Sequence, residues 1–99
     1  MIIVTGLFTV TAENRAEVVT VMMKAAKTAR QAEGCITCAF CADLENMNAI
    51  RLYEEWESEE AHQEALNNPD FPAIGEVINA NNVKWEGGVY AATPHSDDG

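Results

Sequence analysis

The sequence has 99 residues, of which 47% are hydrophobic and 22% are charged, the composition of one small globular domain. No apolar run approaches the roughly 18 residues of a membrane span, so no membrane-spanning segment is expected. Sixteen acidic residues against six Lys and Arg give a net charge of -10, which repels phosphate backbones and anionic lipids. Nucleic acid and membrane surfaces are therefore not the expected partners.

The first residues show no targeting signal. Met1 leads directly into Ile2-Ile3-Val4, with no basic flank and no small-residue cleavage site. The three cysteines are consistent with a reducing compartment. We therefore expect a cytoplasmic protein.

Residues 2–11 are rich in β-branched and aromatic side chains and predict a strand. An amphipathic helix is predicted to follow from Asn14, capped by Thr11 or Asn14 and ended by Gly34 in a left-handed conformation. Its apolar stripe falls at helical spacing. The stripe consists of Ala16, Val19, Met22, Met23, Ala26 and Ala29.

Two further strands are predicted, 35–42 and 49–57, joined by a polar turn. Ser58 then predicts the N-cap of a short helix, and Asp70 the N-cap of another with Pro72 in its first turn. Residues 83–92 form the last predicted strand. The polar segment 93–99 is predicted to be a disordered tail, which leaves 1–92 as the single domain.

The predicted order β-α-β-β-α-α-β indicates an α+β, ferredoxin-like fold with helices on one face of an antiparallel sheet. The other face is also partly apolar, because strand 2–11 places Ile3 and Leu7 opposite Val4 and Phe8. Soluble monomers rarely expose an apolar patch of a few hundred Å². We therefore predict a homodimer closed sheet to sheet.

The cysteines of the segment GCITCAFC stand at intervals of three, which raises the question of a metal or redox site. In a regular strand Cys35 and Cys41 share a face about 20 Å apart, and Cys38 points the opposite way. A thioredoxin-type pair also needs a helix N-terminus, whereas a helix is predicted to end here. We therefore interpret the cysteines as structural, with a redox-sensitive thiol as the remaining alternative.

Two titratable residues are candidates for proton transfer. Glu54 lies on the same strand face as Trp56, where burial would raise the pKa of a carboxyl group toward that of a usable base. The competing interpretation is that Glu54 accepts backbone or Arg hydrogen bonds at a strand end. His62 falls inside the apolar stripe of its predicted helix, where it is either a core residue or an acid or base facing a cavity. Trp85 and Tyr90 are expected on opposite faces of the last strand.

Segments spread over the chain carry a family resemblance. They are Glu33-Gly34-Cys35 after the long helix, LYEEWESEEA from Leu52 to Ala61, and the turn Asn68-Pro69-Asp70-Phe71. Over about residues 1–92 the chain resembles the antibiotic biosynthesis monooxygenase domain. The resemblance implies a dimeric α+β barrel with a pocket between sheet and helices. It also implies an activity such as cofactor-free oxygenation of phenols or quinols, quinol oxidation, haem degradation or isomerisation.

Several positions depart from the family pattern. Ala65 and Asp70 stand where family members often carry histidines, and Cys38 stands where they often carry tyrosine. The region Thr5-Gly6-Leu7 lacks the asparagine of haem-degrading members, so haem degradation is disfavoured.

No phosphate loop, dinucleotide fingerprint or zinc spacing is present, so no cofactor and no metal are expected. The leading hypothesis is a cofactor-independent monooxygenase or quinol oxidase for a small aromatic or quinonoid substrate. His62 and Glu54 are the catalytic candidates, and Trp56, Phe71 and Trp85 are the candidates for substrate binding. The alternatives are a non-catalytic ligand-binding or stress-related protein on the same scaffold, and a small-molecule isomerase.

Overall fold

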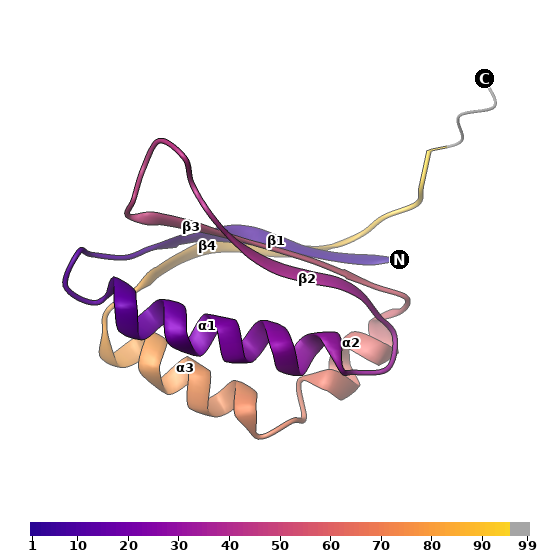
Figure 1. The fold of residues 1–99 in the computed structure, drawn as a ribbon. Helices are drawn as coiled ribbons and strands as arrows, with labels where there is room; N and C mark the ends of the chain where they lie inside the picture. Colours follow the sequence, from indigo (N-terminus) through magenta and orange to yellow (C-terminus); the bar gives the residue numbers. More distant parts are fainter. Residues whose placement is uncertain (96–99) are drawn as a thin grey trace.

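The computed structural model of the protein describes residues 1–95. Its elements follow the predicted order (Figure 1). They are β1 (Ile2–Thr9), α1 (Arg15–Arg30), β2 (Cys35–Ala42), β3 (Ala49–Trp56), α2 (Glu59–Ala65), α3 (Asp70–Ala80) and β4 (Lys84–Ala91).

The four strands form one antiparallel sheet in the order β2-β3-β1-β4. All three helices lie on the same side of this sheet, and among residues 1–95 no helix or strand lies against the opposite side (Figure 1). The predicted α+β, ferredoxin-like fold is therefore confirmed.

The alternation along the strands decides which side chains face the helices. Val4 and Phe8 of β1 face them, whereas Ile3 and Leu7 lie on the open face, as predicted from the sequence. In β3 the helix-facing set begins with Ile50 and Leu52, which are 3% and 7% exposed. Glu54 and Trp56 continue the same set, since successive side chains of a strand alternate faces.

The helix starts agree with the sequence at two of three places. Thr11 and Asn14 exchange side-chain to backbone hydrogen bonds of 2.9 and 3.2 Å ahead of α1. Ser58 caps α2 by accepting from the Ala61 N–H at 3.1 Å. The predicted N-cap Asp70 is wrong, because Pro69 takes that place. The Asp70 carboxylate instead accepts a hydrogen bond from another element, the Thr28 hydroxyl of α1, at 3.0 Å.

Gly34 adopts the predicted left-handed conformation, with φ of 85°, but it does not end the helix. The helix ends at Arg30, and a short turn leads to Gly34. The Gly34 carbonyl accepts a 2.8 Å hydrogen bond from the Glu57 N–H, which ties this turn to the end of β3. A side chain at Gly34 would also overlap Ala61 of α2, so glycine is required by both backbone and space.

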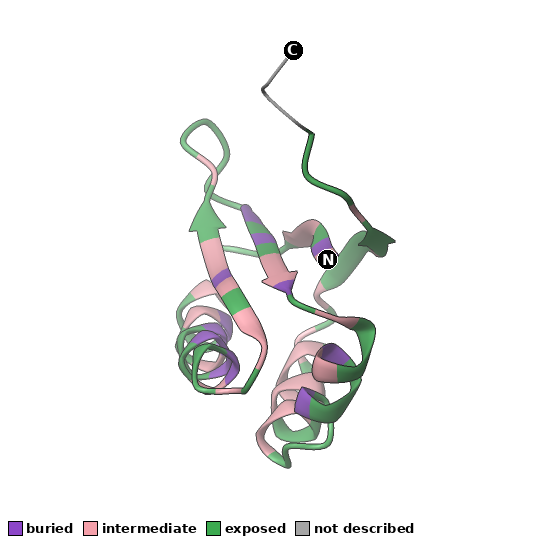
Figure 2. Ribbon diagram, turned by 90° about the vertical axis from the view of Figure 1, so that its right-hand side faces the viewer, coloured by how far each residue is buried: buried purple, intermediate pink, exposed green. Residues whose placement is uncertain are grey.

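The buried residues gather between the helices α1 and α2 and the strands β1, β2 and β3 (Figure 2). One cluster surrounds Trp56, and the other surrounds Val18 and Met22 of α1. In contrast, neither α3 nor β4 contains a buried residue. Burial in the single chain is therefore concentrated on the α1 half of the molecule.

The chain end follows β4 without further secondary structure through residue 95. The predicted tail spans 93–99, and its last four positions, 96–99, lie outside the described residues. Within residues 1–95, no helix is long and apolar enough to span a bilayer.

Candidate functional site

Glu54 and Trp56 are held together on the helix-facing side of β3. The Trp56 indole Nε1–H donates a hydrogen bond of 2.7 Å to Glu54 Oε1. Trp56 is 1% exposed and Glu54 is partly exposed, so this bond joins a core residue to one at the edge of the core. The competing interpretation of Glu54 is wrong in its partner, because the donor is the indole of Trp56 and not a backbone amide or an arginine.

Burial raises the pKa of the Glu54 carboxyl group above its ordinary value of 4.5. The hydrogen bond from Trp56 and the nearby His62 both act in the opposite direction, because they favour the ionised carboxylate. A raised pKa brings a carboxylate closer to the range in which it accepts and returns protons near neutral pH.

His62 of α2 packs beneath the same tryptophan. The rings of His62 and Trp56 are 5.6 Å apart between centroids, with an interplanar angle of 45°. His62 is 7% exposed, and its buried Nδ1 has no hydrogen-bond partner. A buried polar nitrogen without a partner costs free energy, so it points to a ligand or a function that supplies one.

The structure thus brings three of the five predicted site residues together, namely Glu54, Trp56 and His62. A fourth, Phe71 at the start of α3, packs against the cluster that contains Trp56. Phe71 also lines a cavity of about 440 Å³ between the end of α1, α2 and the connection to α3. Its lining includes Ala61, Ala65 and Asn68.

Trp85 lies apart from this group. On β1, Trp85 pairs with Phe8, whereas Glu54 pairs with Val4. Phe8 and Val4 are four residues apart, which corresponds to about 13 Å along the strand. The Trp85 ring stacks against Phe8 at 4.5 Å and is 42% exposed. It lies over Gly6 and Gly87, where any β-carbon would overlap the indole. Tyr90 has the opposite strand parity, as predicted.

The cysteine geometry differs from the prediction. A register shift between Cys35 and Thr37 interrupts the alternation, so Cys35 pairs with Trp56 and Cys38 pairs with Glu54. Cys35 and Cys38 therefore share the helix-facing side, and Cys41 lies on the other. Burial raises the pKa of the Cys38 thiol to about 12, which keeps it protonated and unreactive near neutral pH.

Two positions that depart from the family pattern have structural roles. Ala65 is 9% exposed and packs in the Trp56 cluster. Asp70 lies 3.7 Å from the Lys24 ammonium and accepts the Thr28 hydroxyl, so it fastens α3 to α1.

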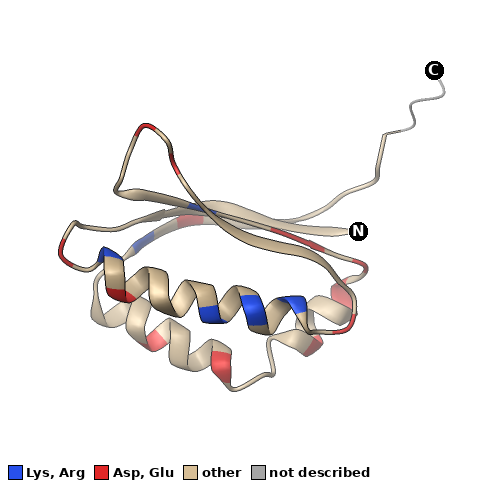
Figure 3. Ribbon diagram, viewed as in Figure 1, with Lys and Arg blue, Asp and Glu red and all other residues tan. Residues whose placement is uncertain are grey.

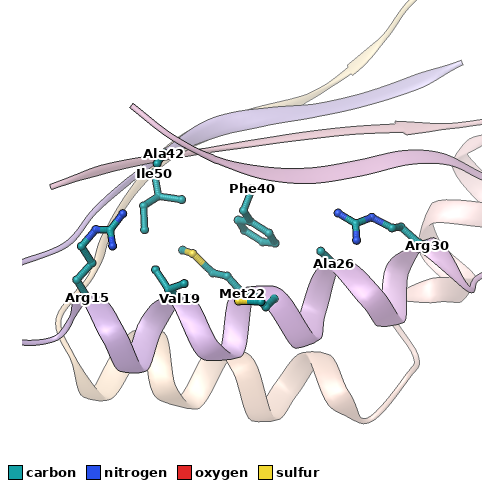
Figure 4. Close-up of a pocket in the computed structure, with 9 residues that line it drawn as sticks. Arg15, Val19, Met22, Ala26, Arg30, Phe40, Ala42 and Ile50 are labelled. Atoms are coloured by element: carbon teal, nitrogen blue, oxygen red, sulfur yellow. The ribbon is translucent and has the colours of Figure 1, made fainter. Parts of the chain in front are cut away.

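Sequence reasoning missed a second cavity, of about 310 Å³, between α1 and the β2 side of the sheet (Figure 4). Met22 and Phe40 line its middle, and Arg15 and Arg30 stand at its two ends. The sequence contains part of the information needed to find this cavity, since both arginines lie beside the apolar stripe of the helix. The orientation of the arginine side chains, however, depends on hydrogen bonds to carbonyl oxygens of other segments, which the sequence does not predict.

Within residues 1–95, no group of three or more His, Cys, Asp or Glu side chains is arranged to hold a metal ion. The site is thus built from one carboxyl group, one imidazole and aromatic rings.

A ferredoxin-like fold with Glu54, Trp56 and His62 in contact beneath its sheet defines the structural class of the chain. The sequence profile of the antibiotic biosynthesis monooxygenases matches residues 1–77, and the chain belongs to this family. A search of curated protein sequences gives no match.

Solved structures share the fold at low sequence identity. A candidate antibiotic biosynthesis monooxygenase from Deinococcus radiodurans is 22% identical, with a TM-score of 0.90, over 98% of this chain and 97% of that one. SnoaB, a cofactor-independent oxygenase from Streptomyces nogalater, is 20% identical with a TM-score of 0.81, over 98% and 97% of the two chains. A conserved protein from Methanosarcina mazei is 22% identical with a TM-score of 0.83, over 93% and 92%.

Proposed function

We propose that the protein is a cofactor-independent monooxygenase or quinol oxidase for a small aromatic or quinonoid substrate. The observation that supports it most is the buried Nδ1 of His62, which has no partner and lies beside Trp56 and Glu54. Family membership and the similarity to SnoaB, itself a cofactor-independent oxygenase, favour the same chemistry.

The proposed reaction begins when a base removes a proton from the bound phenol or quinol. His62 or Glu54 takes this proton, and the electron-rich anion passes an electron to dioxygen. In quinol oxidation, two electrons and two protons reach oxygen, giving a quinone and hydrogen peroxide. In monooxygenation of a methylene carbon, one oxygen atom becomes the new carbonyl and the other leaves as water. Both balances need only substrate and dioxygen.

The apolar surroundings serve this chemistry in two ways. In this proposal Phe71, which lines a cavity, offers a ring face on which a flat substrate stacks. Trp56 is 1% exposed and supports the site from the core side by holding Glu54, and Trp85 supplies a separate exposed ring toward β4. Exclusion of water keeps the reactive anion from being reprotonated and strengthens its interaction with polar groups.

The proposal includes a homodimer. The open face of the sheet carries Ile3, Leu7, Tyr53 and Tyr90, and Tyr53 and Tyr90 are 38% and 56% exposed in the single chain. No helix of the described residues covers this face (Figure 1). The same face also carries Arg51, Glu55 and Glu86, so it is only partly apolar. A second copy related by a two-fold axis places this face against itself and buries its apolar part.

A ligand-binding protein without turnover is a second candidate. It is favoured by the cavity at Phe71, whose lining includes neither Glu54 nor His62. An isomerase on the same scaffold is a third candidate.

Oxygen uptake by the purified protein tests the proposal, with a panel of hydroquinones and polycyclic phenols. Uptake above autoxidation that falls at least about a hundredfold in His62→Ala or Glu54→Gln is expected, the size typical of general acid–base catalysis. Binding without uptake in any panel member would favour the ligand-binding protein. Product formed without oxygen use would identify an isomerase.

A further inference from the structure

The groove between α1 and the sheet has an apolar middle. One wall is the inner side of α1, and the other is formed by β2 and β3 (Figure 4). The apolar lining consists of Val19, Met22, Met23, Ala26, Phe40, Ala42 and Ile50. Since β2 is an edge strand of the sheet, no further strand of residues 1–95 closes the groove on this side.

Each arginine at the ends of the groove is fixed by one hydrogen bond. Arg30 Nε donates to the Cys38 carbonyl oxygen at 2.9 Å, and Arg15 Nε donates to the Met47 carbonyl oxygen at 3.1 Å. Neither guanidinium has a carboxylate partner among residues 1–95. The terminal nitrogens are therefore available for an anion, and their position is already set.

The two ends differ in local charge. Lys24, Lys27 and Arg30 lie along the last two turns of α1, so half of the six basic residues of an acidic chain gather there (Figure 3). At the other end, Glu17 shares the first turn of α1 with Arg15 (Figure 3). The Arg30 end is accordingly the more favourable place for an anion.

A helix C-terminus commonly carries basic residues because they interact with its dipole. Lys27 fits this role. Arg30 instead turns its Nε to a carbonyl of β2 and stands at the end of the groove (Figure 4).

We propose that this groove binds a small aromatic carboxylate, with its ring between α1 and Phe40 and its carboxylate on Arg30. A volume of about 310 Å³ lies at the lower end of the roughly 300–1,000 Å³ of small-molecule sites, which suits one or two rings. The arginines are fifteen residues apart on the helix, about 22 Å, so such a ligand reaches only one of them. The groove shares no lining residue with Glu54, Trp56 and His62, and the inference is independent of the proposed oxygenase activity.

Calorimetric titration with 2-naphthoate and with its neutral analogue, naphthalene-2-carboxamide, tests the ligand class. The carboxylate is expected to bind at least tenfold more tightly than the amide, the size of one charge-assisted hydrogen bond. Arg30→Gln is expected to remove this preference, and Arg30→Lys to keep part of it. Equal affinity for the two probes, or no binding of either, would overturn the proposal.

Arg15→Gln is the matched control, because it removes the same type of charge from the other end of the same groove. It is expected to change naphthoate affinity less than threefold. An Arg15→Gln loss as large as that of Arg30→Gln would contradict the assignment of the anion to Arg30. Thermal melting of each variant shows whether it has kept the fold.

Methionine methyl resonances locate the probe. The chain has four methionines, of which Met22 and Met23 line the groove and Met1 and Met47 do not. Naphthoate is expected to shift the Met22 and Met23 signals in wild-type protein and to shift them less in Arg30→Gln. Shifts confined to Met1 would place the ligand elsewhere, and shifts confined to Met47, whose carbonyl oxygen accepts from Arg15, would place it at the Arg15 end; either result would refute the site at Arg30.

Discussion

Glu54 and Trp56, two residues apart on one face of β3, are joined by a hydrogen bond of 2.7 Å from indole Nε1 to carboxylate Oε1. The spacing itself permits this contact, because residues i and i+2 of a strand point the same way. The bond gives the partly buried carboxylate a donor, and burial still raises the pKa of Glu54. One tryptophan thus orients the acid and, through its ring, also packs on His62.

Glu54→Gln is expected to stabilise the protein at neutral pH and to lose that advantage in acid. Because the pKa of Glu54 is raised in the folded state, the folded protein holds a proton that the unfolded chain releases above its ordinary value of 4.5. The free energy of unfolding therefore falls as pH rises from the unfolded to the folded pKa. Glutamine does not titrate, and its oxygen still accepts from Trp56.

Urea unfolding of both proteins at about pH 4 and about pH 7.5 measures this difference. A stability difference between Glu54→Gln and wild type that is the same at both pH values would show that the raised pKa of Glu54 is not coupled to folding.

His62→Phe is expected to leave stability unchanged or to raise it by about 1 kcal/mol, because it removes a buried nitrogen without a partner. Phenylalanine keeps an aromatic ring against Trp56. Under the proposed function, the same variant loses oxygen uptake when His62 is the base. Chemical denaturation and uptake are measured side by side. A loss of more than about 2 kcal/mol would mean that the imidazole makes a stabilising contact.

Leu7→Glu is expected to convert the proposed dimer to monomer. Leu7 lies on the open face of the sheet, and a two-fold axis places two copies of each substitution in one interface. Burial of added carboxylates there is costly, and Glu86, the partner of Leu7 on β4, adds a like charge to the same face. Sedimentation velocity reads the mass directly, and Thr20→Glu on the exposed side of α1 serves as the control. A wild-type protein that sediments as a monomer at all concentrations would rule out the dimer.

The strand faces were predictable because they follow from local alternation. Val4 and Leu7 are three residues apart and lie on opposite faces, whereas Glu54 and Trp56 are two residues apart and share a face. The helix starts at Asn14 and Ser58 were predictable for the same reason, since each depends on side chains within three residues. Contacts set by the assembled fold were not. The β2 register shift depends on how Cys35 and Thr37 pair with β3.

The roles of Asp70 and Arg30 belong to the same group of unpredicted features. A local pattern assigned Asp70 to a helix cap, whereas Thr28, 42 positions earlier, holds its carboxylate. In the sequence Arg30 is a basic residue at a helix C-terminus, which is common. The orientation of its side chain is set by the hydrogen bond to the Cys38 carbonyl oxygen of β2, which the sequence does not predict. The three-residue cluster at Trp56 combines both kinds of information, because α2 must fold beneath β3 before His62 meets the pair.

Gly6→Ala and Gly75→Ala make a matched pair that tests the packing of Trp85. A β-carbon at Gly6 overlaps the Trp85 indole and the Glu86 carbonyl, so the ring must leave its place beside Phe8. We expect a loss of about 1–3 kcal/mol of unfolding free energy, as for other overpacked sites. Gly75 lies inside α3 with open space around it, so alanine there is expected to add about 0.5–1 kcal/mol.

Urea unfolding measures both changes, and tryptophan fluorescence follows Trp85, which is far more exposed than the buried Trp56. A red shift of emission in Gly6→Ala is expected, because the displaced indole meets more water. If Gly6→Ala keeps wild-type stability and emission, the indole does not lie over β1, and the aromatic surface proposed for substrate binding ends at Phe71.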